Sequence, residues 1–406
     1  MSHHSSATRR RVRWAATLTL GLAALAPTLA AAGSDAAPAT HHGHARSFSY
    51  AVYGDAPYGT SPTDTSETEA TPGFIRTVNA DRRVSAVVHV GDIHSGKQYC
   101  TQSYDEQIAA LWQRFADPLV YTPGDNEWTD CHKAKEGGGT YDPATGQVDY
   151  VTQANGDPAD YAGGNPVDNL ALVRSIFFPR PGRTLGSGRL PVLSQAQVRT
   201  SHPTDRQYVE NVLWRRAGIV FVSINVPGGS NNDADPWYGA PTASPQQTTE
   251  RVNRTAADLR WLRRAFSVAH SSRATGVVVI TQADMWDLDG AADTSHLSNY
   301  EPIVASLASH SLAFRRPVLL LNGDSHVYRS DNPLQKSSAC TGDEDVCSYD
   351  AWASHPSYDV PNFHRVVVHG STVPLEYLRL TVRPGVRLAT SDSTFGPFSW
   401  QRVREG

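Results

Sequence analysis

The sequence has few lysines and no strong excess of charge of either sign. Its 406 residues include 36 lysines and arginines against 40 aspartates and glutamates, which gives a formal net charge of −4. A chain without a basic field does not attract nucleic acid by charge, and we expect no nucleic-acid partner. Lysine occurs only at Lys97, Lys133, Lys135 and Lys336, so arginine supplies almost all of the positive charge.

Cysteine is also scarce, with four residues at Cys100, Cys131, Cys340 and Cys347. None stands in the Cys-x-x-Cys spacing of a zinc site, which favours disulfides formed in an oxidising compartment. Four cysteines allow three pairings. We predict Cys340–Cys347, which closes a short polar loop, and Cys100–Cys131, because each of these two follows an acidic loop.

Long apolar runs are absent beyond the N-terminus, so we expect no stable membrane span in the mature chain. Four arginines at positions 9, 10, 11 and 13 precede an apolar stretch at 14–29 and three alanines at 30–32. This order is typical of a secretory signal. We predict a signal peptide over residues 1–32, of the general secretory rather than the twin-arginine type, and a disordered linker over 33–46. The destination would be secreted or extracytoplasmic.

From residue 47 onward, β-prone runs alternate with amphipathic helical patterns. The sequence predicts strands ending in polar loops at 48–53, 84–90, 118–122, 276–281 and 317–321. It predicts helices at 74–82, 104–115, 248–268 and 300–312. This alternation indicates an α/β domain with largely parallel central strands, spanning residues 47–406.

Two segments depart from the alternation. Residues 133–200 are rich in glycine, proline, aspartate and asparagine, which predicts a loop-rich insertion with one helix near 168–178. Further runs predict antiparallel strands, at 208–215, 218–226, 365–369 and 375–382.

A glycine–aspartate pair follows four of the predicted strands, ending in Asp55, Asp92, Asp125 and Asp324. Loops at the carboxyl ends of strands converge in open α/β sheets, so these carboxylates are expected to lie together. Four converging carboxylates repel one another and require cations. Each pair alone could be an ordinary turn, but the series predicts a metal centre. His326, two residues after Asp324, adds a nitrogen ligand.

In order, the blocks are Gly54-Asp55-Ala56-Pro57, Gly91-Asp92, Gly124-Asp125-Asn126-Glu127, Gln282-Ala283-Asp284 and Gly323-Asp324-Ser325-His326. This series resembles the calcineurin-like metallophosphoesterases over roughly residues 48–330. The resemblance implies a layered α/β/β/α sandwich with mixed sheets and a metal site at the carboxyl ends of the strands. It also implies hydrolysis of a phosphate mono- or diester by a metal-bound hydroxide.

The resemblance implies two divalent ions bridged by Asp92. One would be held by Asp55, Asp92 and His326. The other would be held by Asp92, Asp125, Asp324 and the amide oxygen of Gln282. Relative to the family pattern, several imidazoles are replaced by oxygen ligands, which favours harder ions such as Mn²⁺, Mg²⁺ or iron over Zn²⁺.

The proton donor is the open part of the expected mechanism. Asn126 stands where the family has a histidine; it can hydrogen-bond a phosphate oxygen but cannot supply a proton. His94 and His132 are the alternative candidates for the proton donor. Each could instead be an ordinary solvated loop histidine. Lys97 and Arg329 are candidate phosphate contacts or ordinary surface residues. The rival function is a non-catalytic module that binds metal or phosphate. The sequence does not define an oligomeric state.

Overall fold

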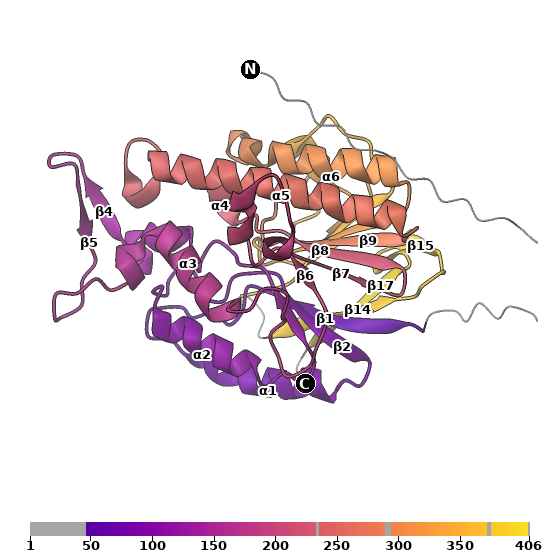
Figure 1. The fold of residues 1–406 in the computed structure, drawn as a ribbon, viewed down its shortest axis with the longest axis horizontal. Coiled ribbons are helices and arrows are strands. Elements are labelled where there is room, and N and C mark those ends of the chain that lie inside the picture. Colours follow the sequence, from indigo (N-terminus) through magenta and orange to yellow (C-terminus); the bar gives the residue numbers. More distant parts are fainter. Residues whose placement is uncertain (1–45, 233–234, 289–293, 372–374, 405–406) are drawn as a thin grey trace, which may run out of the picture. The chain divides into compact units, whose positions relative to one another are not determined.

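A computed structural model describes residues 46–232, 235–288, 294–371 and 375–404. These residues belong to one compact unit, His44–Gly406. The predicted signal peptide, and all but the last residue of the predicted linker, lie outside the described residues. Two mixed β-sheets pack face to face between helices, as Figure 1 shows.

The first sheet has seven strands in the order β15-β16-β17-β14-β1-β2-β3. β1 (Phe48–Tyr53), β2 (Val84–His89) and β3 (Leu119–Tyr121) run parallel to one another. β14 (Glu376–Val382) pairs antiparallel with β1 and begins an antiparallel edge. That edge is completed by β17 (Phe398–Arg404), β16 (Thr394–Gly396) and β15 (Leu388–Ser391).

The second sheet has eight strands in the order β12-β11-β13-β10-β9-β8-β7-β6. Its centre is parallel and comprises β8 (Ile219–Ser223), β9 (Gly276–Ile280), β10 (Val318–Asn322) and β13 (Phe363–Val367). The edges are antiparallel and comprise β6 (Leu193–Ser194), β7 (Val212–Arg216), β11 (Arg329–Asp331) and β12 (Thr341–Gly342).

The alternation of side chains along each strand separates three apolar layers. In β1, Phe48, Tyr50 and Val52 pack between the two sheets, whereas Ala51 and Tyr53 pack toward the helices of the first sheet. Those helices are α1 (Ser66–Ala80), α2 (Gln102–Trp112) and α3 (Pro166–Phe177). α5 (Pro245–Ser271) and α6 (Glu301–Phe314) cover the second sheet. The predicted layered α/β/β/α sandwich is therefore confirmed.

Most predicted elements are present, with differences at the sheet edges. The segments at 218–226 and 365–369, predicted as antiparallel strands, correspond to β8 and β13. β8 pairs antiparallel with β7, as predicted, but its other neighbour β9 is parallel to it. β13 likewise lies between the antiparallel β11 and the parallel β10. The C-terminal strands β15 to β17 were not predicted at all.

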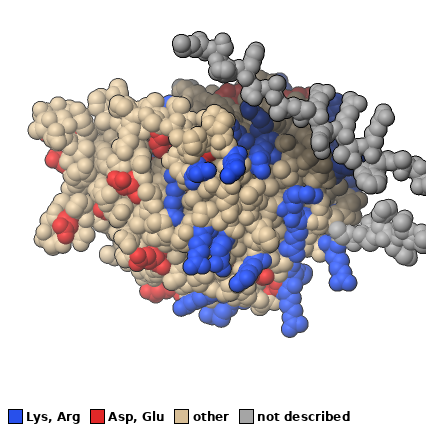
Figure 2. Space-filling view, viewed as in Figure 1, with Lys and Arg blue, Asp and Glu red and all other residues tan. Residues whose placement is uncertain are grey.

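The segment 133–200 holds short elements around α3. β4 (Gly139–Asp142) and β5 (Gln147–Tyr150) form a separate two-stranded hairpin, at the left of Figure 1. Among the described residues, no helix has the length and apolarity needed to cross a bilayer. Figure 2 shows basic side chains gathered over the part of this face near β1, β2 and β14, with acidic side chains mainly toward α2, α3 and the hairpin.

Candidate metal centre

The candidate ligands lie in loops that follow five parallel strands. Asp55 follows β1, Asp92 follows β2, Asp125 follows β3, Gln282 follows β9, and Asp324 and His326 follow β10. The loops are tied to one another, since the Asp55 N–H donates to the Gly91 carbonyl at 2.9 Å and the Ala56 N–H to the Asp92 carbonyl at 3.0 Å. The two sheets thus bring residues far apart in the sequence to a shared edge.

Four of these residues have left-handed backbone conformations. The φ angles are +50° at Asp55, +59° at Asp92, +78° at Asp324 and +64° at His326. A non-glycine residue with positive φ costs about 1–3 kcal/mol and persists only where its surroundings hold it. Such strain gathers at functional sites, and here it coincides with residues proposed as ligands.

Asp55, Asp92 and His326 form one half of the centre, which we call the imidazole half. Each offers one ligand atom, and these atoms all lie within 4.8 Å of one another. The buried Asp55 carboxylate accepts the Asp324 N–H through Oδ1 at 2.9 Å. Its Oδ2 is buried and has no hydrogen-bond partner among the described residues. An orphaned carboxylate oxygen beside a second carboxylate and an imidazole fits a divalent cation.

Asp92, Asp125, Asp324 and Gln282 form the other half, which we call the amide half. The Gln282 Nε2 lies 3.2 Å from Asp92 Oδ2, 3.1 Å from Asp125 Oδ1 and 3.0 Å from Asp324 Oδ1. The amide oxygen, which the sequence predicts as a metal ligand, instead accepts the Gly228 N–H at 2.6 Å. This half therefore presents a donor nitrogen to its carboxylates.

The loop after β3 is held by Glu127. The Gly124 N–H donates to Glu127 Oε1 at 2.6 Å, and the Tyr121 hydroxyl donates to the same oxygen. A Cβ on Gly124 would stand 1.9 Å from Asp92 Oδ1, so only glycine lets the two loops approach this closely. The sequence shows Glu127 beside Asp125 but gives no sign of this supporting role.

Tyr58 is a functional candidate that sequence reasoning missed. Its hydroxyl donates to Asp92 Oδ2 at 2.8 Å, accepts the Asn126 Nδ2–H at 3.0 Å and lies 3.2 Å from His326 Nε2. Asn126 also reaches Asp92 through its backbone N–H and its Nδ2, each at 3.3 Å. The only sign of Tyr58 in the sequence was its position three residues after Asp55.

Burial dominates the electrostatics of the centre. Burial, together with neighbouring carboxylates, raises the pKa of Asp55, Asp92 and Asp324 well above the ordinary value and that of Asp125 to about 7. Burial also lowers the pKa of His326 to about 4, which keeps its imidazole neutral. A cation would stabilise the charged carboxylates, and a neutral imidazole is the form that binds metals.

The two candidate proton donors, His94 and His132, are both buried and have other hydrogen-bond partners. His94 is buried, with Nδ1 3.1 Å from the Ser95 carbonyl, and packs against Tyr104. His132 is buried, and its Nδ1 accepts the Tyr238 N–H at 3.0 Å. Burial lowers the pKa of both histidines to about 4. Among the described residues, neither hydrogen-bonds a candidate metal ligand, and their catalytic role stays a prediction.

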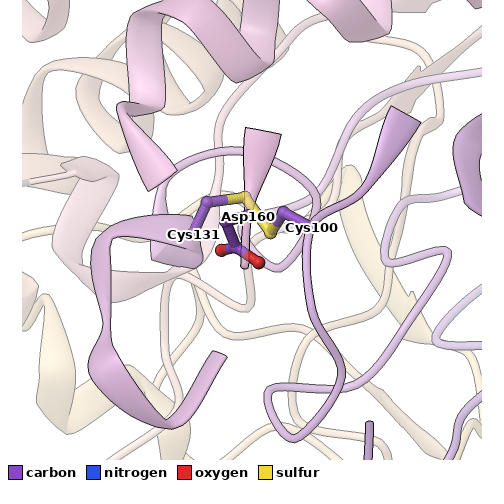
Figure 3. A group of neighbouring side chains, drawn as sticks. All are labelled: Cys100, Cys131 and Asp160. Atoms are coloured by element: carbon purple, nitrogen blue, oxygen red, sulfur yellow. A yellow bond between two sulfur atoms is a disulfide. The ribbon is translucent and has the colours of Figure 1, made fainter. Parts of the chain in front are cut away.

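Both predicted disulfides are confirmed, with S–S distances of 2.06 Å for Cys100–Cys131 and 2.03 Å for Cys340–Cys347. Figure 3 shows the Asp160 carboxylate beside the first of these bonds. Burial raises the pKa of Asp160 to about 9. The two sulfurs are bonded to each other, so this group does not form a thiolate metal site. The disulfide instead joins the loops that follow β2 and β3.

Arg329 does not fit either predicted role, as a phosphate contact or as a surface residue. Its side chain is buried and donates to Asp331 Oδ2 at 2.7 Å. Arg365 joins the same network by pairing with both Asp331 and Asp284. Asp284 in turn donates its backbone N–H to Asp324 Oδ2 at 2.9 Å. These buried ion pairs hold the loops after β9 and β10 in position.

The sequence matches no family model and no curated protein. The structure is similar to PhoD, with a TM-score of 0.44 and 12% identity over 83% of this chain and 64% of that one. It is similar to the purple acid phosphatase PPD1 from yellow lupin (Lupinus luteus) seeds, with a TM-score of 0.40 and 13% identity over 84% of this chain and 50% of that one. It is also similar to GAP50, the anchor in the inner membrane complex of Plasmodium, with a TM-score of 0.38 and 10% identity over 87% of this chain and 78% of that one.

The chain spans less than two thirds of the length of the first two of these proteins. The layered sandwich, with the aspartate loops at the carboxyl ends of its strands, has the architecture that the resemblance to calcineurin-like metallophosphoesterases implies.

Proposed function

We propose that this chain is an exported, metal-dependent phosphoesterase whose metal centre includes Asp55, Asp92 and His326. One observation carries the proposal. Three loops bring two carboxylates and an imidazole within 4.8 Å of one another, and a buried oxygen of Asp55 lacks a partner among the described residues. Keeping such groups together without a cation would be costly.

A divalent ion bound there would supply Lewis-acid polarisation of a phosphoryl oxygen and would lower the pKa of a water. The chain's own residues would orient the reacting groups. The Tyr58 hydroxyl and the Asn126 amide both donate to Asp92 Oδ2 and fix the direction of that carboxylate. The role predicted for Asn126 from the sequence, a hydrogen bond to a phosphate oxygen, would require its Nδ2 to release either the Tyr58 hydroxyl or Asp92 Oδ2.

Substrate would approach from the side of His326. The His326 side chain is 34% exposed, whereas that of Asp55 is fully buried. The open side carries the imidazole and the neighbouring Tyr58 hydroxyl, 3.2 Å from His326 Nε2. These groups suit a small phosphate ester, and they do not distinguish a monoester from a diester.

Export is supported by the predicted signal peptide and by two disulfides, which persist in oxidising compartments. A non-catalytic binding module is the second candidate function. It is favoured by one observation: the two histidines proposed as proton donors are buried and hydrogen-bond no candidate ligand among the described residues. Catalytic turnover of a phosphate ester distinguishes the phosphoesterase from the binding module.

The test is chelation of the purified chain, addition of single metals and a screen of aryl phosphate monoesters and diesters. We expect hydrolysis to stop on chelation and to return with Mn²⁺ or Mg²⁺ more fully than with Zn²⁺, because oxygen ligands predominate. Metal binding without hydrolysis of any ester would favour the binding module. Recovery with Zn²⁺ alone would contradict the oxygen-rich ligand assignment.

A further inference from the structure

The side-chain amide of Gln282 lies at the point where three carboxylates converge. Asp92, Asp125 and Asp324 come from the loops after β2, β3 and β10, and each directs an oxygen to Gln282 Nε2 at 3.0–3.2 Å. These are N–H···O distances. The amide N–H groups therefore supply the positive partial charge that a cation shared by the three carboxylates would otherwise supply.

The orientation of this amide is set by the backbone. Gln282 Oε1 accepts the Gly228 N–H at 2.6 Å. Rotating the amide by 180° would place its NH₂ against the Gly228 N–H and its oxygen among three carboxylates. Both new contacts would be repulsive, one between donors and one between acceptors. The amide nitrogen carries two protons and cannot coordinate a metal in place of the oxygen.

Gly228 is itself held firmly in place. It begins α4 (Gly228–Asn232), a short turn in which Gly229, Ser230 and Asn231 have left-handed backbones. The buried Arg254 fixes this turn by donating to the Asn225 carbonyl at 3.0 Å and to Asn231 Oδ1 at 2.6 Å. The N–H that orients the Gln282 amide is thus part of a rigid structure.

The same turn leaves little space beside the carboxylates. A Cβ on Gly228 would stand 2.1 Å from Asp125 Oδ2 and 2.6 Å from Asp324 Oδ1. The backbone at Gly228 therefore closes one side of the amide half. On the other side of the centre, the imidazole half keeps a buried carboxylate oxygen without a partner among the described residues.

We propose that the Gln282 amide replaces a second cation, so that the chain binds one metal ion, in the imidazole half, instead of the two that its motifs imply. This inference rests on the proposed function only for the first ion. The amide hydrogen-bonds Asp92, Asp125 and Asp324 and holds them in place, and the ion at Asp55, Asp92 and His326 is the one that serves the reaction.

The test counts ions in the full-length mature protein. Calorimetric titration with Mn²⁺, checked by elemental analysis, is expected to give one ion per chain. Gln282→Glu is the decisive variant, because the new side chain has the same shape and can still accept the Gly228 N–H. It places a carboxylate oxygen where the NH₂ was, and the count is expected to rise from one to two. Gln102→Glu, at the exposed start of α2, adds the same charge elsewhere and should leave the count at one.

Two ions per chain in the unaltered protein would overturn this inference while leaving the proposed function intact. No bound ion would contradict the proposed function itself. A count of one in a folded Gln282→Glu variant would show that the amide does not occupy a cation position. Should that variant fail to fold, Asp125→Asn provides the second test: it should keep one ion, and loss of that ion would overturn the inference.

Discussion

The two halves of the centre share Asp92 but satisfy their polar groups differently. In the amide half, one nitrogen contacts an oxygen of each of three carboxylates, and the backbone fixes that nitrogen through the Gly228 N–H. In the imidazole half, Asp55 Oδ2 is buried and has no partner among the described residues, and His326 is partly exposed. One half is complete within the protein, and the other is suited to an added ligand.

Under the proposal that Gln282 replaces an ion, a metal centre changes without loss of its scaffold. Aspartates at strand ends do not by themselves set the number of ions. That number depends on whether a protein donor already occupies the position between them. The following predictions test this contrast, beginning with the residue common to both halves.

Asp92→Asn should have the largest effect. The substitution removes charge from both halves, and losing several kcal/mol of metal-based stabilisation corresponds to a decrease in kcat/KM of about a thousandfold. Steady-state hydrolysis of an aryl phosphate measures it. Asp149→Asn, on the exposed β4–β5 hairpin, is the matched control and should retain full activity. Equal activity in the two variants would refute a catalytic metal centre at Asp92.

His326→Ala and Asp125→Asn should separate the two halves. His326→Ala removes the nitrogen ligand of the imidazole half, so it should weaken ion binding and lower activity about a hundredfold. Asp125→Asn should lower activity no more than about tenfold, as expected for a group that acts through its neighbours. Elemental analysis alongside kinetics gives both readouts. A reversed order of effects would mean that the amide half holds the catalytic ion.

Tyr58→Phe should have a moderate effect. It removes the hydroxyl that donates to Asp92 Oδ2, and the loss of such a supporting hydrogen bond costs about tenfold in metal affinity or activity. The titration that counts ions should show one ion bound more weakly. Unchanged affinity and unchanged kcat would show that Tyr58 has no part in the centre.

His132→Gln should leave activity unchanged. His132 is buried and accepts the Tyr238 N–H, so its replacement should lower the free energy of unfolding by about 1 kcal/mol. Chemical denaturation and kinetics together test this expectation. A loss of kcat with an altered acid limb of the pH profile would instead support the sequence-based role of His132 as proton donor.

The lowered pKa of His132 also predicts a small effect of pH on the stability of the fold. Burial lowers its pKa to about 4, below the value of about 6.5 in an unfolded chain. Between these values the unfolded chain binds more protons, so stability falls as the pH falls from about 6.5 toward 4. The His132→Gln variant should show a shallower decline, and parallel curves for the two proteins would contradict this assignment.

The sequence predicted the strand ends because their signals are local. A buried run followed by glycine and aspartate defines both the strand and its polar loop, and β1 has the predicted bounds, 48–53. The parallel pairing of β8 with β9 and of β13 with β10 was not predictable in this way, because it depends on which distant strands lie beside them. β15 and β16 were missed because short, partly exposed strands at a sheet edge have a weak apolar pattern. β17 lies between β16 and β14, and it was missed because only its first residues alternate between apolar and polar.

Within the centre, residue types were predictable but their orientations were not. The sequence places Gln282 after β9, yet the direction of its amide depends on Gly228, 54 residues away. Tyr58 was missed because no periodic pattern shows where a loop side chain points. Arg329 was misassigned because its burial depends on β11 lying beside β13 in the sheet, although its partner Asp331 is only two residues away.

The most direct test of the account is to titrate the chelated protein with Mn²⁺ while recording bound ions and aryl phosphate hydrolysis together. The account predicts that activity rises in proportion to the first equivalent and reaches its maximum at one ion per chain. Hydrolysis that continues in the fully chelated protein, at the rate of the metal-loaded protein, would contradict it.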